Sequence, residues 1–208
     1  FGTGDFLTDD LRYCIIFTTK AVEIWEEMTR KGRAFMTEKL LVFDTETTGF
    51  RSDDEVLTLA IVNGMGQTVV DRMYAPTRKR SWPEAERVNR ISPAMVEGCA
   101  PILSHREELE RMFNDPETLL VGYNIAFDIR LLGQSGIQIT NPNQHDVMLA
   151  FSEMRKVPDA RRGGYRWWKL VECADYYRYD WGNTQAHGAL ADTLATLYCY
   201  RKMNEPIY

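Results

Sequence analysis

The chain lacks several features that would place it in a special class of protein. No apolar run approaches the roughly 20 residues that span a bilayer, and residues 1–10 have neither the basic nor the apolar region of a signal peptide. The four cysteines lie far apart, without CxxC or Cys/His spacing, so we expect buried thiols in a reducing, cytoplasmic protein. Internal repeats and low-complexity tracts are missing too. These absences favour an ordinary globular protein with no membrane partner.

An excess of positive charge is also missing. The formal net charge is −5, so a nucleic-acid partner would have to be attracted by local basic patches or by bound metal. Of the 208 residues, 44% are hydrophobic, which suits one domain with a sizeable core and an appendage. The chain starts with Phe1 rather than Met, so we expect a fragment or a domain of a longer protein.

Two segments can be distinguished by their patterns. Residues 1–37 predict a strand at 12–17 and a helix that ends at Gly32, which we interpret as an extension packed on the main domain or a remnant of a fused module. Residues 38–208 predict strands and helices in this order: strands 39–43, 55–63 and 67–75, helices 83–97 and 104–114, strand 118–122, helix 123–136, strand 137–140, a helix after Asp146, and a helix at 188–203. Antiparallel strands beside helix-connected strands predict an α/β fold with a mixed central sheet flanked by helices.

Two acids end the first strand of this domain, in the run LLVFDTETTGF. Side chains at i and i+2 of a strand share a face, so Asp44 and Glu46 point to the same place. Two carboxylates at that distance repel, and one would protonate unless a cation lay between them. The alternative is that both acids only form turns or caps near Thr47, Thr48 and Gly49. A lone pair of acids favours that alternative, so further ligands are needed.

A third acid, Asp128, lies in the first turn of an unusually apolar helix. Between Ile125 and Leu132 only Asp128 and Arg130 are not apolar, and Asn124 is placed to cap the helix. An unpaired buried carboxylate costs on the order of several kcal/mol, so Asp128 needs a partner. An ion pair with Arg130 is the alternative to a metal role, although side chains at i and i+2 of a helix do not face each other.

A fourth acid lies on the last helix, which has two different faces. One face is bulky, and the other carries small residues around one charge: Ala189, Asp192, Thr196 and Cys199. His187 precedes Asp192 by five residues, although a solitary histidine is more often structural. If the four acids meet at one edge of the sheet, two divalent cations would neutralise them, and oxygen ligands suit Mg²⁺ or Mn²⁺.

Three stretches, FDTETTGF, NIAFDIRLL and HGALAD, resemble the motifs of the DEDDh class of 3′→5′ exonucleases. This DnaQ-like group includes the polymerase III proofreading subunit, ribonuclease T and oligoribonuclease. The resemblance covers about Lys39 to Met203 and keeps the HxAxxD spacing from His187 to Asp192. It implies a ribonuclease H-like fold with a five-stranded mixed sheet. It also implies two-metal hydrolysis of nucleic acid from a free 3′ end to nucleoside 5′-monophosphates, with single-stranded DNA or 3′ overhangs as the expected substrate.

The resemblance also implies roles for individual residues. Asp44 would bridge two Mg²⁺ ions, for which Mn²⁺ would substitute. Glu46 and Asp192 would hold the ion that binds the attacking water, and Asp128 would help to hold the second. His187 would be the general base, since its ordinary pKa of about 6.5 suits proton transfer near neutral pH.

Further candidates would contact the substrate: the backbone around Thr47 and Thr48, Asn124, and more weakly Leu57 as a wedge against the terminal base. The run RKVPDARRGGYRWWK, residues 155–169, is rich in basic and aromatic residues. It is a candidate groove for a single strand, with phosphate contacts from Arg161, Arg162 or Arg166 and stacking on an aromatic residue. The alternative is a solvated loop followed by a helix, with Trp167 and Trp168 partly in the core. Asp146 is expected to be a cap or core contact rather than a fifth ligand, and His145 to be incidental.

Several functions stay open at this point. An exoribonuclease of the ribonuclease T or oligoribonuclease type is the main alternative to a DNA exonuclease, because the motifs do not sense a 2′-hydroxyl. A non-catalytic nucleic-acid-binding module and a ribonuclease H-type endonuclease are less favoured, since all five motif residues are present. Domains of this kind occur alone, with polymerases or helicases in proofreading and end trimming, or fused to a CRISPR adaptation protein.

Overall fold

The computed structural model describes residues 39–161, 163–182 and 188–205. The strand and helix expected within residues 1–37 lie outside these ranges, as do Arg162 and His187. The compact unit that is described begins at Lys39, and the division into residues 1–37 and 38–208 stays a prediction.

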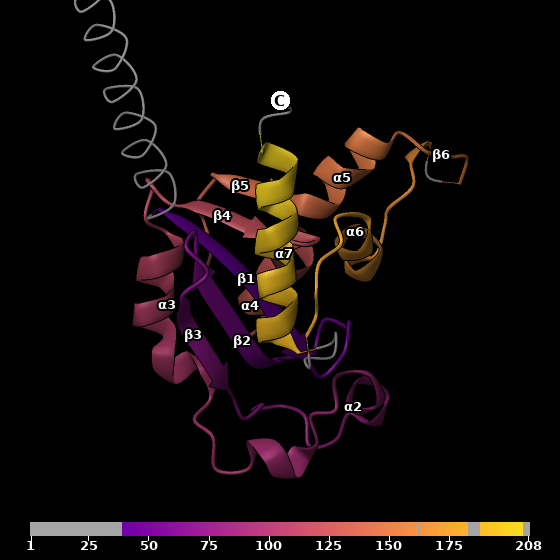
Figure 1. Ribbon diagram of the computed structural model, residues 1–208. Helices are drawn as coiled ribbons and strands as arrows, with labels where there is room; N and C mark the ends of the chain where they lie inside the picture. Colours follow the sequence, from indigo (N-terminus) through magenta and orange to yellow (C-terminus); the bar gives the residue numbers. More distant parts are fainter. Residues whose placement is uncertain (1–38, 162, 183–187, 206–208) are drawn as a thin grey trace, which may run out of the picture. The chain divides into compact units, whose positions relative to one another are not determined.

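The described unit is built on a five-stranded sheet with the order β3-β2-β1-β4-β5 (Figure 1). Its strands are β1 (Leu40–Thr47), β2 (Val56–Asn63), β3 (Thr68–Met73), β4 (Leu119–Gly122) and β5 (Gln144–Asp146). β1 pairs with β2 antiparallel and with β4 parallel, β2 pairs with β3 antiparallel, and β4 pairs with β5 parallel. The predicted mixed sheet is therefore confirmed.

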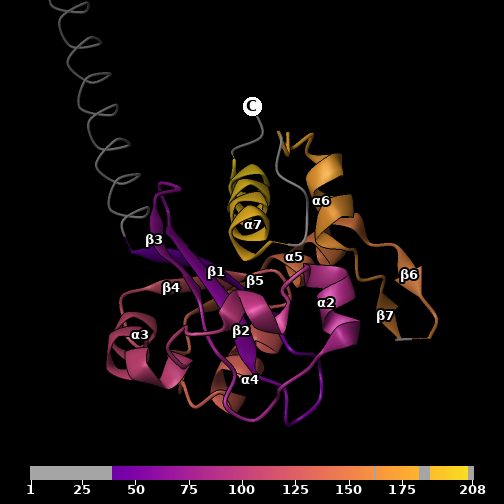
Figure 2. The ribbon, with the colours of Figure 1, turned by 90° about the horizontal axis from the view of Figure 1, so that it is seen from below.

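Helices cover both faces of the sheet (Figure 2). One face is covered by α3 (Arg106–Phe113) and α4 (Ile125–Gln134), and the other by α5 (Val147–Arg155), α6 (Leu170–Tyr176) and α7 (Ala189–Asn204). The remaining elements are short: α2 (Pro83–Asn89), the 3₁₀ helices η1 (Pro93–Val96) and η2 (Ile102–His105), and a hairpin of β6 (Pro158–Asp159) and β7 (Gly164–Tyr165). This arrangement confirms the expected α/β class.

The alternation of β1 divides its side chains between two cores. Leu40 and Val42 pack in a core with residues of α5, α6 and α7, whereas Phe43 packs in another with residues of α3 and α4. Since alternate residues of a strand share a face, Asp44 and Glu46 continue the α7 side and Thr45 continues the α4 side. The end of β1 also carries a register irregularity between Glu46 and Thr47, which bends the strand where the acids lie.

The prediction of a strand at residues 137–140 was wrong, because the structure has no strand there. Ile137 is fully buried in the α3–α4 core, but the backbone of this segment is held by side chains of α3 and its end. Gln138 N donates to Glu110 Oε1 at 2.8 Å, and Thr140 N donates to Asn114 Oδ1 at 2.7 Å. The fifth strand is instead β5, whose polar sequence Gln-His-Asp gives no apolar pattern.

The helix expected at 83–97 is also shorter than predicted. α2 ends at Asn89, Arg90 takes the left-handed conformation with φ 63°, and Ser92 is extended. Pro93 disfavours helical backbone in the residue before it, so the signal for this break was in the sequence. The helix expected at 104–114 begins within the 3₁₀ helix η2 and becomes α-helical only from Arg106.

Two cysteines that are distant in sequence meet between α6 and α7. Cys173 and Cys199 are both free and fully buried, and the contact between their thiols, together with burial, raises the pKa of Cys173. The expectation of buried thiols holds for this pair but not for Cys99, which is half-buried, and the spacing of Cys173 and Cys199 gave no sign of their contact. In the part of the chain that the structure describes, no helix combines the length and the apolarity needed to cross a bilayer.

Candidate active site

Three of the four predicted acids meet at the end of β1. Carboxylate oxygens of Asp44, Glu46 and Asp192 lie within 4.8 Å of one another, and all three residues are half-buried. β1 supplies the first two from its α7-facing side, and α7 supplies Asp192 from its first turn. The small residues predicted on α7, such as Ala189 and Thr196, are buried, so the helix approaches the sheet closely.

This carboxylate cluster is electrostatically costly without a cation. Burial, followed by the charge of Asp192, raises the pKa of Glu46 to about 8, against the lowering effect of a hydrogen bond from Asn89. Burial and the charges of Asp128, Asp192 and Glu46 raise the pKa of Asp44 well above its ordinary value. A divalent cation would allow these acids to ionise together, and a set of carboxylate oxygens fits Mg²⁺ or Mn²⁺.

Asp128 is close to the cluster but has a different partner. The residue is 2% exposed, and its Oδ1 accepts hydrogen bonds from Thr45 N at 3.0 Å and from Thr45 Oγ1 at 2.6 Å. Burial raises the pKa of Asp128 to about 7, although the two bonds from Thr45 lower it. Thr45 lies between Asp44 and Glu46 and points to the α4 side of β1, so its hydrogen bonds hold the Asp128 carboxylate in place. The alternative partner, Arg130, instead contacts Phe50 O and the Phe127 ring.

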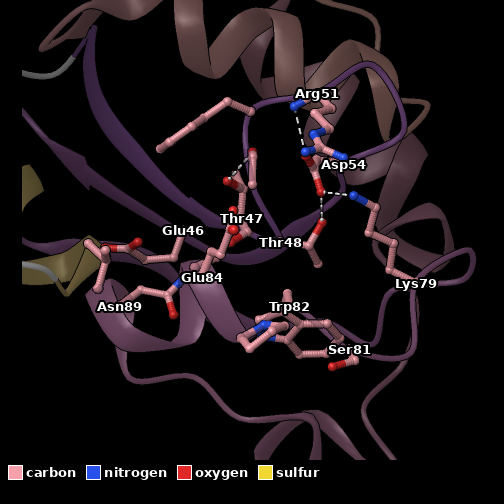
Figure 3. Close-up of a pocket in the computed structure, with 15 residues that line it drawn as sticks. Glu46, Thr47, Thr48, Arg51, Asp54, Lys79, Ser81, Trp82, Glu84 and Asn89 are labelled. Atoms are coloured by element: carbon pink, nitrogen blue, oxygen red, sulfur yellow. Dashed lines mark hydrogen bonds and ion pairs between the residues drawn. The ribbon is translucent and has the colours of Figure 1, made fainter.

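A cavity of about 440 Å³ opens beside Glu46 (Figure 3). Thr47 and Thr48 line it from the end of β1, and Trp82 and Asn89 line it from the segment around α2. Asn89 Nδ2 donates to Thr47 O at 3.1 Å, which ties α2 to the acidic strand. The structure therefore places both candidate threonines in a hollow next to the carboxylate cluster.

The walls of this cavity are fixed by two acids that the sequence interpretation missed. Asp54 is buried, forms an ion pair with Lys79 and accepts from Thr48 Oγ1 at 2.7 Å, as the dashed lines in Figure 3 show. Glu55 accepts from the backbone nitrogens of Arg78 at 2.8 Å and of Lys79 at 3.2 Å, and Lys79 lines the cavity. The run of acids directly before the apolar strand β2 was the available signal.

The other sequence candidates fare differently. Leu57 is fully buried among Trp82, Ile91 and Val96, so it offers no surface to a nucleotide, and the expected wedge is not supported. Asn124 occupies the N-cap position of α4, but its side chain makes no capping bond there, contrary to the prediction.

Asp146 behaves as expected for a cap. Its Oδ1 accepts from Met148 N at 2.9 Å and Leu149 N at 3.2 Å at the start of α5. The same oxygen accepts from Asn124 N at 3.1 Å, so Asp146 also holds the start of α4.

The described residues of the basic segment after α5 include the short strands β6 and β7 and lead into α6. Arg161 is exposed in the turn between β6 and β7, where its backbone N bonds to Asp159. Arg166 forms an ion pair with Glu172, and its guanidinium lies 4.0 Å from the centre of the Trp168 ring. A phosphate would therefore compete with Glu172 for Arg166.

A groove of about 550 Å³ lies beside Asp192. Its lining includes Phe50, Asn124, Trp167, Lys169 and Asp192. Asp192 thus belongs both to the groove and to the carboxylate cluster.

Comparison with known proteins decides the family. The exonuclease (RNase_T) family model matches residues 41–200, which is most of the chain and includes all of the acids described above. The chain belongs to the exonuclease family. One relative of this exonuclease-family chain is an uncharacterized exonuclease, CP81, of Escherichia phage 186. It is 26% identical over 180 residues, which cover 82% of this chain and 90% of the relative.

Solved structures agree on the fold of this exonuclease-family chain. Exonuclease I from Methylocaldum szegediense superposes with a TM-score of 0.61 at 22% identity, over 79% of this chain but only 40% of that protein. Exonuclease X, solved with a 5′-overhanging duplex DNA, gives a TM-score of 0.58 at 19% identity, over 79% and 90% of the two chains. The fold is therefore the ribonuclease H-like fold of exonucleases.

Proposed function

We propose that the chain is a metal-dependent 3′→5′ exonuclease that shortens single-stranded DNA or 3′ overhangs to nucleoside 5′-monophosphates. The observation that carries this proposal is the carboxylate cluster at the end of β1, with a cavity directly beside it. Membership of the exonuclease family supports a nuclease, and the polarity and the substrate are our inference. Exonuclease X in its complex with duplex DNA supports DNA as the polymer.

The acids suit two divalent cations, which we take to be Mg²⁺ with Mn²⁺ as a substitute. Asp44, Glu46 and Asp192 would hold one ion, since their oxygens already lie within 4.8 Å. Asp44 and Asp128 would hold the second, and both hydrogen bonds from Thr45 go to Oδ1 of Asp128, so they do not use Oδ2. When bound, such ions supply positive charge that stabilises the attacking and leaving oxygens of phosphodiester hydrolysis.

The chain's own residues would orient the reactants. The cavity lined by Thr48 and Trp82 would take the terminal nucleoside, and the Thr47–Thr48 backbone would meet it. The bond that breaks joins the terminal phosphate to the 3′ oxygen of the next nucleotide, which leaves as a 3′-hydroxyl. His187 lies outside the described residues and remains our candidate for the group that takes the proton of the attacking water.

Digestion of an oligonucleotide labelled at its 5′ end tests the proposal. With Mg²⁺ or Mn²⁺ we expect a ladder of products shortened one nucleotide at a time, and no cleavage of a circular single strand. Short RNA in a parallel reaction distinguishes the exoribonuclease alternative. Cut circles would indicate an endonuclease, and binding without cleavage would indicate a non-catalytic module.

A matched pair of variants assigns the activity to the cluster. Asp44→Asn should abolish digestion, because it removes the charge that both proposed ions share. Asp71→Asn, a substitution of an exposed acid on β3, should leave it unchanged. Equal activity of Asp44→Asn and the wild type would refute the mechanism. Association with a polymerase, a helicase or a CRISPR adaptation complex stays a prediction.

A further inference from the structure

The groove beside Asp192 is placed to receive the rest of a substrate strand. Phe50 lines both this groove and the cavity beside Glu46, and its side chain is 76% exposed. The cavity reaches the carboxylate cluster through Glu46, and the groove reaches it through Asp192. A strand with its terminal nucleoside in the cavity and its scissile phosphate at the cluster would therefore continue into the groove.

Trp167 is the exposed aromatic side chain that lines this groove from the segment before α6. It is 45% exposed, whereas the adjacent Trp168 packs against the core of α5, α6 and α7. Folding normally buries a large apolar ring, since its burial is worth about 1.5–3 kcal/mol. A partly exposed tryptophan in a groove that also contains Asp192 is typical of a surface that stacks on a ligand.

The backbone that carries Trp167 is rigidly held. Its neighbours on both sides are fixed by three hydrogen bonds: Arg166 N to Val157 O at 2.8 Å, Tyr123 Oη to Trp168 O at 2.9 Å, and Lys169 N to Glu172 Oε2 at 2.7 Å. Arg155 and Arg166 also stack on the Trp168 ring, at 5.0 and 4.0 Å from its centre. Trp167 is thus presented from an ordered segment, which lowers the entropic cost of binding.

We propose that Trp167 stacks on a nucleobase upstream of the scissile bond and so binds the single strand that is being shortened. This inference rests on the proposed function and adds a subsite to it. The ligand is a single-stranded nucleic acid of any sequence, because every base has a face that an indole can stack on. Lys169, in the lining of the same groove, supplies a positive charge for the strand's phosphates. Arg166 acts by holding the segment in place rather than by binding phosphate, because it pairs with Glu172.

Two substrates test the subsite separately from the chemistry. A hexathymidylate with a free 3′ end has upstream bases, whereas the p-nitrophenyl ester of thymidine 5′-monophosphate has none. We expect Trp167→Ala to raise KM for the hexamer about 5- to 150-fold, the range for loss of one base stack, and to leave hydrolysis of the ester unchanged. Trp167→Phe should restore most of the affinity for the hexamer, which a purely structural role of the indole would not predict.

Tyr176→Ala is the matched control, because Tyr176 is an exposed aromatic of α6 outside the groove lining. It should keep the wild-type KM for the hexamer. Wild-type kinetics of Trp167→Ala on the hexamer would overturn the subsite and leave the groove to another occupant, such as a protein segment. An equal loss on both substrates, or in both alanine variants, would also overturn it. A wild-type protein that hydrolyses neither substrate would instead overturn the proposed function itself.

Discussion

Without divalent cations the protein should lose stability as the pH rises from 5 to 8. The folded protein raises the pKa of Glu46 from its ordinary 4.5 to about 8, so the folded state binds this proton more tightly than the unfolded chain does. The resulting stabilisation is fully present below pH 4.5 and is lost as the pH passes through 8. The pKa of Asp44 is shifted in the same direction by burial and by the charges of its neighbours, Glu46 included, and that of Asp128 is shifted mainly by burial, so the effects of the three acids do not simply add.

The magnitude follows from the shift of Glu46. A full pKa unit is worth about 1.4 kcal/mol, and part of the titration lies outside pH 5–8, so the free energy of unfolding should fall by on the order of 3–4 kcal/mol between these two pH values. For a domain of this size about 1 kcal/mol corresponds to roughly 2–4 °C in Tm, so we expect a decrease of about 6–16 °C. Saturating Mg²⁺ or Mn²⁺ should reverse most of this decrease, and more at pH 8 than at pH 5, because cations compete with protons for the same oxygens.

Thermal melting with EDTA or with Mg²⁺ at several pH values measures these effects. Glu46→Gln removes the titrating group and serves as the reference, so the comparison cancels the titration of other residues. If the metal-free wild type and Glu46→Gln had parallel curves of Tm against pH, the account of the cluster as mutually repelling acids would be wrong. A Mg²⁺ effect of equal size at pH 5 and pH 8 would contradict it as well.

Three further substitutions test other parts of the site. Thr45→Val should raise the pKa of Asp128 further and increase the Mg²⁺ concentration needed for half-maximal hydrolysis, because it removes a hydrogen bond to a charged group, worth about 1.5–3 kcal/mol. Thr45→Ser keeps the hydroxyl and should behave as the wild type in the same titration. Gly49→Ala should lower Tm and weaken nucleotide binding, since a Cβ there would lie 2.6 Å from Oδ2 of Asp54, at a φ of +151°; normal melting and binding would show that the loop adapts. Asp146→Ala should cost about 0.5–2 kcal/mol of stability in denaturant unfolding through loss of the α5 cap, and Asp146→Asn should cost less.

The sequence predicted those parts of the fold that have a strong local pattern. The apolar run of β1, the hairpin between β2 and β3, and the last helix all lie close to their expected positions. β5 could not be found in this way, because three polar residues carry no periodicity and its place depends on pairing with β4. Residues 137–140 had the pattern of a strand, yet Asn114 and Glu110 satisfy their backbone instead.

The sequence also predicted part of the candidate site, namely the acids that meet, but not the contacts that hold them. The meeting of Asp44, Glu46 and Asp192 follows from strand alternation and the small face of α7, and the structure brings them together. The partner of Asp128 was not foreseen, because it depends on α4 and β1 packing across the sheet rather than on helical spacing. Cavity walls such as the one built on Asp54 are likewise set by contacts between separate loops.

The alternation along β1 has a consequence for how this enzyme tolerates change. Side chains between Leu40 and Asp44 can be exchanged for others of similar bulk at modest cost, because each occupies one side of a well-defined layer. One inserted or deleted residue in the same stretch would turn both motif acids toward α4 and present Thr45 to α7. The spacing of this strand is therefore under tighter constraint than its composition, and length variants should be inactive where most conservative point variants still work.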